Sequence, residues 1–172
     1  MSEPLPYVLT ALRSRITAVF PAQIRECLAQ LDDEQIWWRP NESSNSIGNL
    51  VIHLAGSLNH YLNRAIGGFE YDRDRAAEFA ERRHIPKAEL LSIFDDMVTK
   101  AGTTFDHLTV ERLGDPSPEQ KMYTLLVEDL VSILSHIANH TGQILWITKM
   151  LRDGSLNDVW MKTHKRLGAW KA

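Results

Sequence analysis

Apolar residues recur at steps of three and four along most of this chain, and strict alternation of apolar and polar residues is scarce. Steps of three and four place apolar side chains on one face of an α-helix, whereas alternation is typical of a half-buried strand. The pattern therefore predicts four long amphipathic helices, over residues 7–31, 46–66, 86–108 and 121–151.

Residues that start or stop helices stand at several of these boundaries. Ser46 is a good N-cap for the second helix, and the glycines at 67–68 are expected to end it. Pro86 is expected in the first turn of the third helix, a position that tolerates proline. The Asp-Gly pair at 153–154 is expected to end the fourth helix. Pro21 lies inside the first helix and is expected to kink or divide it.

The connections differ in composition from the helices. Residues 69–85 are highly charged and are interpreted as a solvated loop with room for a short helix, and the polar tail also has room for one. Four amphipathic helices with such connections predict an all-α fold, an antiparallel four-helix bundle with a short C-terminal extension. Residues 1–172, 44% of them hydrophobic, suit a single domain with one core.

Charge and composition argue against several classes of partner. The 19 basic and 22 acidic residues give a net charge of −3 with no basic patch, so we expect no nucleic-acid partner. The longest apolar-rich run, 122–151, contains Glu128, Asp129 and two histidines, which is too polar for a membrane span. The prolines at 4 and 6 and the lack of an apolar run argue against a signal peptide. With a single cysteine, Cys27, the expected compartment is the reducing cytoplasm.

The stretch SHIANHTGQI carries two histidines, His136 and His140, four residues apart. On a helix, this spacing puts two imidazoles on one face, where both can bind one metal ion. Ile137 stands where metalloproteases with an H-E-x-x-H motif carry their glutamate base, which disfavours that class. Two histidines at the edge of the core, hydrogen-bonded to neighbours, are the alternative.

His53 favours the metal site over the alternative of two hydrogen-bonded histidines at the edge of the core. Its sequence neighbours are apolar, so it is expected to face inward, and a buried imidazole without a partner is costly. A metal shared by His53, His136 and His140 would satisfy all three and leave coordination positions open, as catalytic sites do. His60 lies two turns further, about 10 Å along the helix, so lining a pocket suits it better than binding the metal.

The other three of the seven histidines are expected to be surface or cap residues. His84 lies in the charged loop, His164 lies in the polar tail, and His107 lies near a helix C-terminus, where a cation complements the helix dipole.

The segments NSIGNLVIHLAG and HIANHTGQI, with WWRP before the first of them, resemble the DinB-like metalloprotein family, which is related to the YfiT-type proteins. The similarity covers residues 31–151. It implies a four-helix bundle in which His53, His136 and His140 bind a divalent metal, most often zinc or nickel. Some relatives are transferases that use a low-molecular-weight thiol, and several form homodimers. A small-molecule thiol, an electrophilic substrate and a homodimer partner are therefore expected.

A three-histidine site is compatible with more than one activity. A divalent ion lowers the pKa of a bound thiol, which suits a thiol S-transferase. The same ion can make hydroxide from water, which suits a hydrolase. A non-catalytic bundle that binds a metal or ligand, linked to stress as the family name suggests, is the third alternative.

Several polar residues near the three histidines are candidates for orienting them or for binding substrate. Gln143 and Asn49 share the histidine face at helical spacing, although an exposed or core-satisfied amide is an equal alternative. Asp129 could orient an imidazole as a carboxylate partner, or lie on a solvated face. Trp38, with Trp37 and Tyr61, could line a pocket or anchor the core. Cys27 is expected to be a buried small hydrophobe.

Overall fold

The computed structural model describes residues 5–119, 122–152 and 156–164, and this part of the chain contains no β-strand. The all-α prediction is confirmed. The four long helical segments are α1–η1–α2 (Leu5–Ser14, Arg15–Val19, Phe20–Ala29), α4–η2 (Ile47–Leu58, Asn59–Arg64), α6 (Lys87–Asp106) and α7 (Leu126–Arg152). Four short elements complete the set, namely α3 (Asp33–Trp37), α5 (Arg75–Ala80), the 3-10 turn η3 (Glu111–Gly114) and α8 (Asn157–His164).

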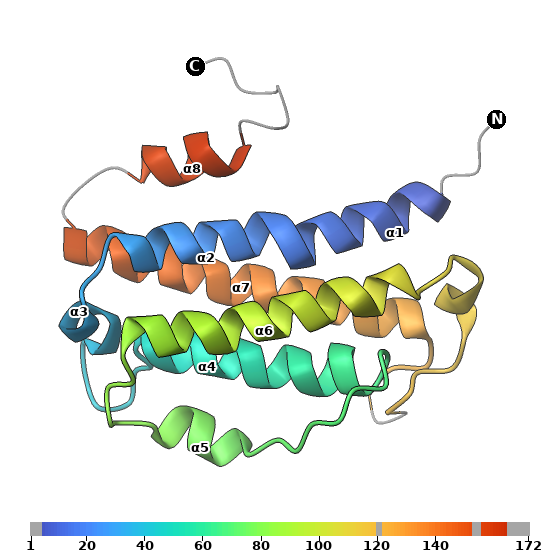
Figure 1. The fold of residues 1–172 in the computed structure, drawn as a ribbon, viewed down its shortest axis with the longest axis horizontal. Coiled ribbons are helices and arrows are strands. Elements are labelled where there is room, and N and C mark those ends of the chain that lie inside the picture. The colour runs from blue at the N-terminus through green and yellow to red at the C-terminus, as the bar shows by residue number, and fades with distance from the viewer. Residues whose placement is uncertain (1–4, 120–121, 153–155, 165–172) are drawn as a thin grey trace.

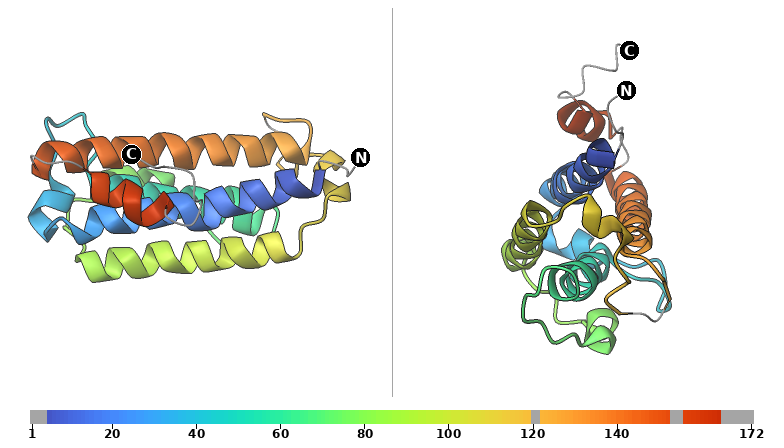
Figure 2. Two further views of the ribbon diagram at one scale, coloured as in Figure 1. Left: turned by 90° about the horizontal axis from the view of Figure 1, so that it is seen from above. Right: turned by 90° about the vertical axis from the view of Figure 1, so that its right-hand side faces the viewer.

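The long helices pack around one core, with α4 against both α6 and α7, and α2 against α7 (Figure 1, Figure 2). The first helical segment and α7 run one way, and α4 and α6 run the other way (Figure 1). This arrangement needs a long return connection between α4 and α6. Residues 65–86 provide it, and they carry α5 across the outer face of α4 (Figure 2).

Pro21 does not divide the first helix. A π-helical turn, η1, precedes it, and the flanking residues Val19 and Phe20 keep right-handed helical backbone angles. A proline ring clashes with the carbonyl four residues earlier, and a wider turn gives that carbonyl more room. The helix therefore continues through Pro21 to Ala29, which corrects the expectation of a break.

The start and end of α4 agree with the sequence analysis. The Ser46 hydroxyl accepts a hydrogen bond from the Asn49 backbone N–H (3.1 Å), and the Asn49 side chain accepts one from the Ser46 N–H (3.4 Å), which forms a capping box. Gly68 adopts a positive φ of 76° just beyond the helical residues, a conformation that glycine accepts without strain.

The fourth helix begins later than predicted. α7 starts at Leu126, because Leu125 pairs with Pro116 in an isolated antiparallel bridge and holds the preceding backbone extended. The Glu128 carboxylate accepts hydrogen bonds from the N–H groups of Thr124 and Leu125 (both 2.9 Å) and so caps the helix. The predicted start near residue 121 and the predicted stop at 153–154 lie outside the described residues.

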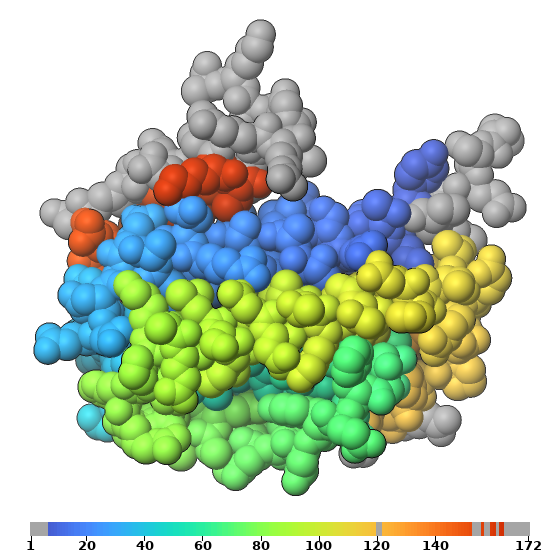
Figure 3. Space-filling view, viewed as in Figure 1, coloured from blue at the N-terminus to red at the C-terminus, as the bar shows by residue number. Residues whose placement is uncertain are grey.

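The core is mainly aliphatic and lies between the long helices. Its largest fully buried side chains include Phe94 of α6, Leu54 of α4 and Ile24 of α2. In the space-filling view, α6 occupies the middle of the face turned to the viewer, between the first helical segment and the 65–85 connection (Figure 3). In the described part of the chain, no helix is both long enough and apolar enough to cross a membrane.

Candidate metal centre

Three histidines from two helices converge in the middle of the bundle. His53 comes from α4, and His136 and His140 come from adjacent turns of α7. One ring nitrogen of each lies within 4.8 Å of the others, and the Nε2 atoms of His53 and His136 are 3.0 Å apart. The three ring centroids are separated by 4.6–5.0 Å, with the rings close to perpendicular in pairs.

This donor set suits a divalent ion. Two nitrogens that each bind one ion at about 2.0–2.1 Å in tetrahedral geometry lie about 3.4 Å apart. The 3.0 Å distance between Nε2 of His53 and Nε2 of His136 is close to that value, and all three nitrogens lie within 4.8 Å of one another. Several common divalent metals accept imidazole ligands, and the set of three histidines found among the described residues leaves room for a further ligand.

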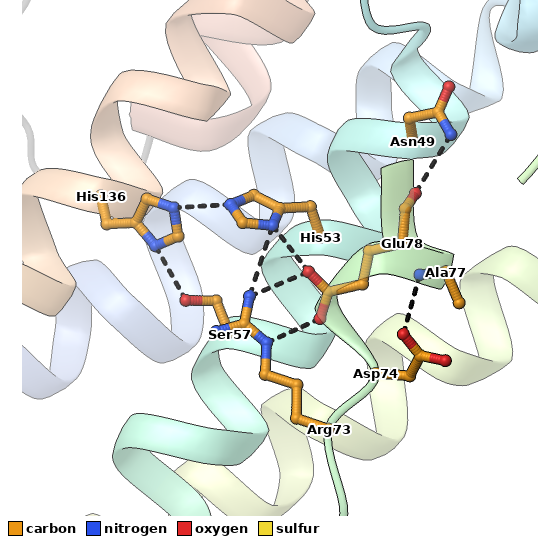
Figure 4. A network of polar contacts seen from close by, with 8 residues as sticks. All are labelled: Asn49, His53, Ser57, Arg73, Asp74, Ala77, Glu78 and His136. Atoms are coloured by element: carbon orange, nitrogen blue, oxygen red, sulfur yellow. Dashed lines mark hydrogen bonds and ion pairs between the residues drawn. The ribbon is translucent and has the colours of Figure 1, made fainter. Parts of the chain in front are cut away.

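Glu78 of α5 orients His53. The Nδ1–H of His53 donates to Oε2 of Glu78 over 2.8 Å, and Arg73 holds the same carboxylate with two hydrogen bonds of 2.7 and 2.8 Å (Figure 4). All three side chains are at least nine-tenths buried. Because Nδ1 keeps its proton, Nε2 carries the lone pair that faces the other histidines. A carboxylate, a histidine and a metal in line are a recurrent arrangement in metal sites.

The other two imidazoles have their own partners at Nδ1. The Ser57 hydroxyl lies 3.2 Å from Nδ1 of His136 (Figure 4). A hydroxyl both donates and accepts, so Ser57 suits either tautomer of that ring. Nδ1 of His140 donates to Oε1 of Gln143 over 2.9 Å, which leaves Nε2 of His140 for a metal. Each of the three rings is thus held at the nitrogen that faces away from the others.

Burial favours the neutral form of His53 and His136. Burial lowers the pKa of His53, although its hydrogen bond to Glu78 works in the opposite direction. Burial, followed by the nearby His140 and His53, lowers the pKa of His136 to about 4. Burial opposes ionisation of Glu78, but the hydrogen bonds from Arg73 and His53 outweigh it and hold its pKa below the usual value. Neutral imidazoles are the form that binds metals.

A glycine and two hydrogen-bonded side chains place Glu78 against α4. A Cβ atom on Gly56 would collide with the Glu78 carboxylate, so the close approach requires glycine at this position. Asp74 caps α5 by accepting a hydrogen bond from the Ala77 N–H (2.9 Å). The Asn49 side-chain amide donates to the backbone carbonyl of Glu78 (3.1 Å) and ties α5 to α4 (Figure 4).

A cavity of about 440 Å³ opens beside the histidines. His53 and His136 form part of its wall, so a group that enters the cavity reaches two of the three imidazoles. The remaining wall comes from α4–η2, the 65–86 connection, residues 117–119 and 122–123, and the first turns of α7. Its lining residues are Ser57, Tyr61, Arg73, Arg75, Ser117, Glu119, Met122, Tyr123, Asp129, Ser132 and Ile133.

A comparison with family models matches residues 6–163 to the family described as "Protein of unknown function (DUF1572)". The chain belongs to this family. No curated protein matches the DUF1572 chain. The resemblance to the DinB-like family stays a prediction, because the matched family does not carry that name.

The residues predicted to surround the metal site of the DUF1572 protein differ in what they contact in the structure. Gln143 contacts a histidine, whereas Asn49 acts through the backbone of α5. Asp129 lines the cavity, and it is Glu78 that provides the carboxylate partner of an imidazole. His60 packs edge-on against Tyr61 and lies 4.0 Å from the Glu119 carboxylate. Trp38 packs against the core, partly buried.

The structure also tests the predictions for the remaining tryptophan, tyrosine and histidines. Tyr61 lines the cavity, whereas Trp37 is buried in the core and its indole N–H donates to the carbonyl of Ile85 (3.0 Å). His84 is exposed and stacks on Trp37, and His107 is exposed at the C-terminus of α6, as expected. The side chain of His164 lies outside the described part.

Three residues of the site were not predicted from the sequence, namely Glu78, Arg73 and Ser57. The charged 69–85 segment was interpreted as solvated, yet it supplies Glu78 and Arg73. One available signal was Asp74, a good N-cap four residues before Glu78, which predicts a helical turn there. Ser57 lies four residues after His53, so helical spacing alone places it on the same face.

Proposed function

We propose that His53, His136 and His140 bind one divalent metal, zinc or nickel, and that the DUF1572 protein is a metal-dependent transferase that uses a low-molecular-weight thiol. The observation that carries the proposal is the orientation of the imidazoles. Nδ1 of each ring has one partner, which is Glu78 for His53, Ser57 for His136 and Gln143 for His140. The opposite edges of the three rings converge, and the rings of His53 and His136 line a cavity.

A divalent ion held there would lower the pKa of a bound thiol, which makes the reactive thiolate available at neutral pH. The protein's own residues do the rest. Glu78 and Gln143 hold two imidazoles in place, and the Arg73–Glu78 pair keeps the adjacent wall of the cavity rigid. The cavity admits the thiol and its acceptor beside the histidines.

The thiol has to come from a small molecule. Cys27 is the chain's single cysteine, and its side chain is fully buried in the core. Burial raises the pKa of the Cys27 thiol to about 11, so it stays protonated at neutral pH. A buried thiol of this kind is inert as a nucleophile.

A metal-dependent hydrolase is the second candidate, and Asp129 is the observation that favours it. Its carboxylate lines the cavity, and its Oδ2 atom has no hydrogen-bond partner among the described residues. A carboxylate placed beside a metal site can act as a general base toward water. This reading predicts hydrolysis of esters or amides without any thiol.

The decisive experiment gives metal-loaded protein a thiol and an electrophile. With cysteine and 1-chloro-2,4-dinitrobenzene, the sulfur forms a bond to the ring carbon, chloride leaves, and the thiol proton passes to solvent. We expect a rate above the uncatalysed reaction that disappears in His53→Ala together with the metal. Gln143→Ala should keep the metal at saturating concentration and lower the rate by up to about a hundredfold, as for one removed polar contact.

Three outcomes separate the candidates. Full activity in metal-free protein contradicts the proposal. Hydrolysis of p-nitrophenyl acetate that needs metal and no thiol supports the hydrolase. Metal-loaded protein that is inert to a panel of thiols and esters supports a non-catalytic binding bundle.

A further inference from the structure

The cavity beside the histidines carries one positive and one negative side chain that no described residue neutralises. Arg75 is exposed and takes part in no ion pair within the described part of the chain, and Asp129 likewise takes part in none there. The other charged groups of the wall are paired, since Arg73 is bound by Glu78, and Glu119 pairs with Arg64. Arg75 and Asp129 are therefore the charges left for a ligand.

Arg75 is positioned next to the metal-binding histidines through one aromatic ring. Its guanidinium lies over the ring of Phe79, 5.3 Å from the centroid, and Phe79 in turn packs against His53 with 4.6 Å between ring centroids. Both residues belong to α5. This stacking holds the Arg75 side chain beside the site without using the hydrogen-bond donors of its guanidinium.

Asp129 stands on a different element, α7, seven residues before His136 and hence on the same side of that helix. Its Oδ2 atom is buried and lacks a hydrogen-bond partner in the described structure. Ser117 lines the same cavity with its side chain 1% exposed, and its Oγ likewise lacks a partner there. Buried polar atoms without partners are rare, and both of these atoms belong to side chains that line the cavity.

We propose that the cavity recognises a zwitterionic, amino-acid-like group. Arg75 binds the carboxylate of this group, and Asp129 with Ser117 accepts hydrogen bonds from its ammonium. The inference deepens the proposed function, on which it rests, because it makes the preferred thiol an aminothiol carboxylate of which cysteine is the simplest example. This pair of opposite charges would make the site selective, because a thiol that lacks the carboxylate leaves Arg75 unpaired and one that lacks the ammonium leaves Asp129 unpaired.

The test measures binding to metal-loaded protein by calorimetry, with four small thiols that differ in which charged groups they carry. Cysteine has both groups, cysteamine lacks the carboxylate, 3-mercaptopropionate lacks the ammonium, and 2-mercaptoethanol lacks both. We expect Asp129→Asn to raise Kd at least about tenfold for cysteine and cysteamine only, and Arg75→Gln to do so for cysteine and 3-mercaptopropionate only. Asp96→Asn and Arg83→Gln are controls, because both residues are exposed charges outside the cavity.

Binding of serine, which has no thiol, tests the zwitterion site independently of the proposed thiol transfer. Wild-type protein, with or without metal, should bind serine, and both cavity variants should lose that binding while keeping the wild-type metal content and melting temperature. That result supports the zwitterion site even if no thiol reacts. Equal affinities of wild type, Asp129→Asn and Arg75→Gln for all ligands would overturn it, as would a wild type that binds neither cysteine nor serine.

Discussion

Gly56→Ala tests whether Glu78 orients the metal site, because it changes neither a metal ligand nor Glu78 itself. In an ordinary helix this substitution is favourable by about 0.5–1 kcal/mol, since alanine loses less conformational freedom than glycine on folding. Here the new methyl group would collide with the carboxylate of Glu78. We therefore expect the opposite sign, with Gly56→Ala less stable than the wild type.

The size of the stability loss follows from the hydrogen bonds that Glu78 loses when it moves. It accepts one buried hydrogen bond from His53 and two part-buried hydrogen bonds from Arg73, all between 2.7 and 2.8 Å. A hydrogen bond to a charged group contributes about 1.5–3 kcal/mol. Loss of one or two of them, less the helix gain, lowers the free energy of unfolding by about 1–5 kcal/mol. Loss of the contact to His53 should also weaken metal binding about 10- to 100-fold.

Urea unfolding of the metal-free protein measures the stability change, and competition with a chelator measures the metal affinity. Gly142→Ala on α7 is the matched control, since nothing lies within 4 Å of a Cβ placed there. The control should be stabilised by about 0.5–1 kcal/mol with unchanged metal affinity. If Gly56→Ala behaves like this control in both measurements, the role assigned to Glu78 is wrong.

Three further predictions address the ligands, the cysteine and the assembly. His136→Ala should lose the metal and His60→Ala should retain it, measured by elemental analysis; equal metal content in the two variants would contradict the ligand assignment. Because burial raises the pKa of Cys27 to about 11, the unfolded chain loses this proton first as pH rises. The free energy of unfolding should thus fall by about 1 kcal/mol more in wild type than in Cys27→Ala between about pH 8 and 10, and equal slopes would refute this. Sedimentation should show a homodimer, and a sole species of 19.6 kDa would count against it.

The long helices could be predicted because their causes are local. Ser46 and Asn49 form the capping box that starts α4, and both are recognisable in the sequence. The apolar spacing likewise placed His53, His136 and His140 on inward faces. The start of α7 could not be found this way, because it depends on the pairing of Leu125 with Pro116 from a separate segment.

The surroundings of the histidines were harder to predict, because they depend on tertiary contacts across the 65–86 connection. A charged segment usually faces solvent, and nothing local marks Glu78 as buried. Its burial becomes favourable only when Arg73 neutralises it and His53 donates to it. Helical spacing relates Asp129 to His136 and made it a candidate carboxylate partner, with a solvated face as the alternative, but the partner comes from another element.

The most direct test of the account is the metal content of the purified protein after loading with zinc or nickel and removal of unbound ions. The account predicts about one divalent ion per chain in the wild type and almost none in the double variant His136→Ala/His140→Ala, with both proteins folded by circular dichroism. A folded wild-type protein that retains no metal, or a double variant that retains as much as the wild type, would contradict the central claim that these histidines form a metal site.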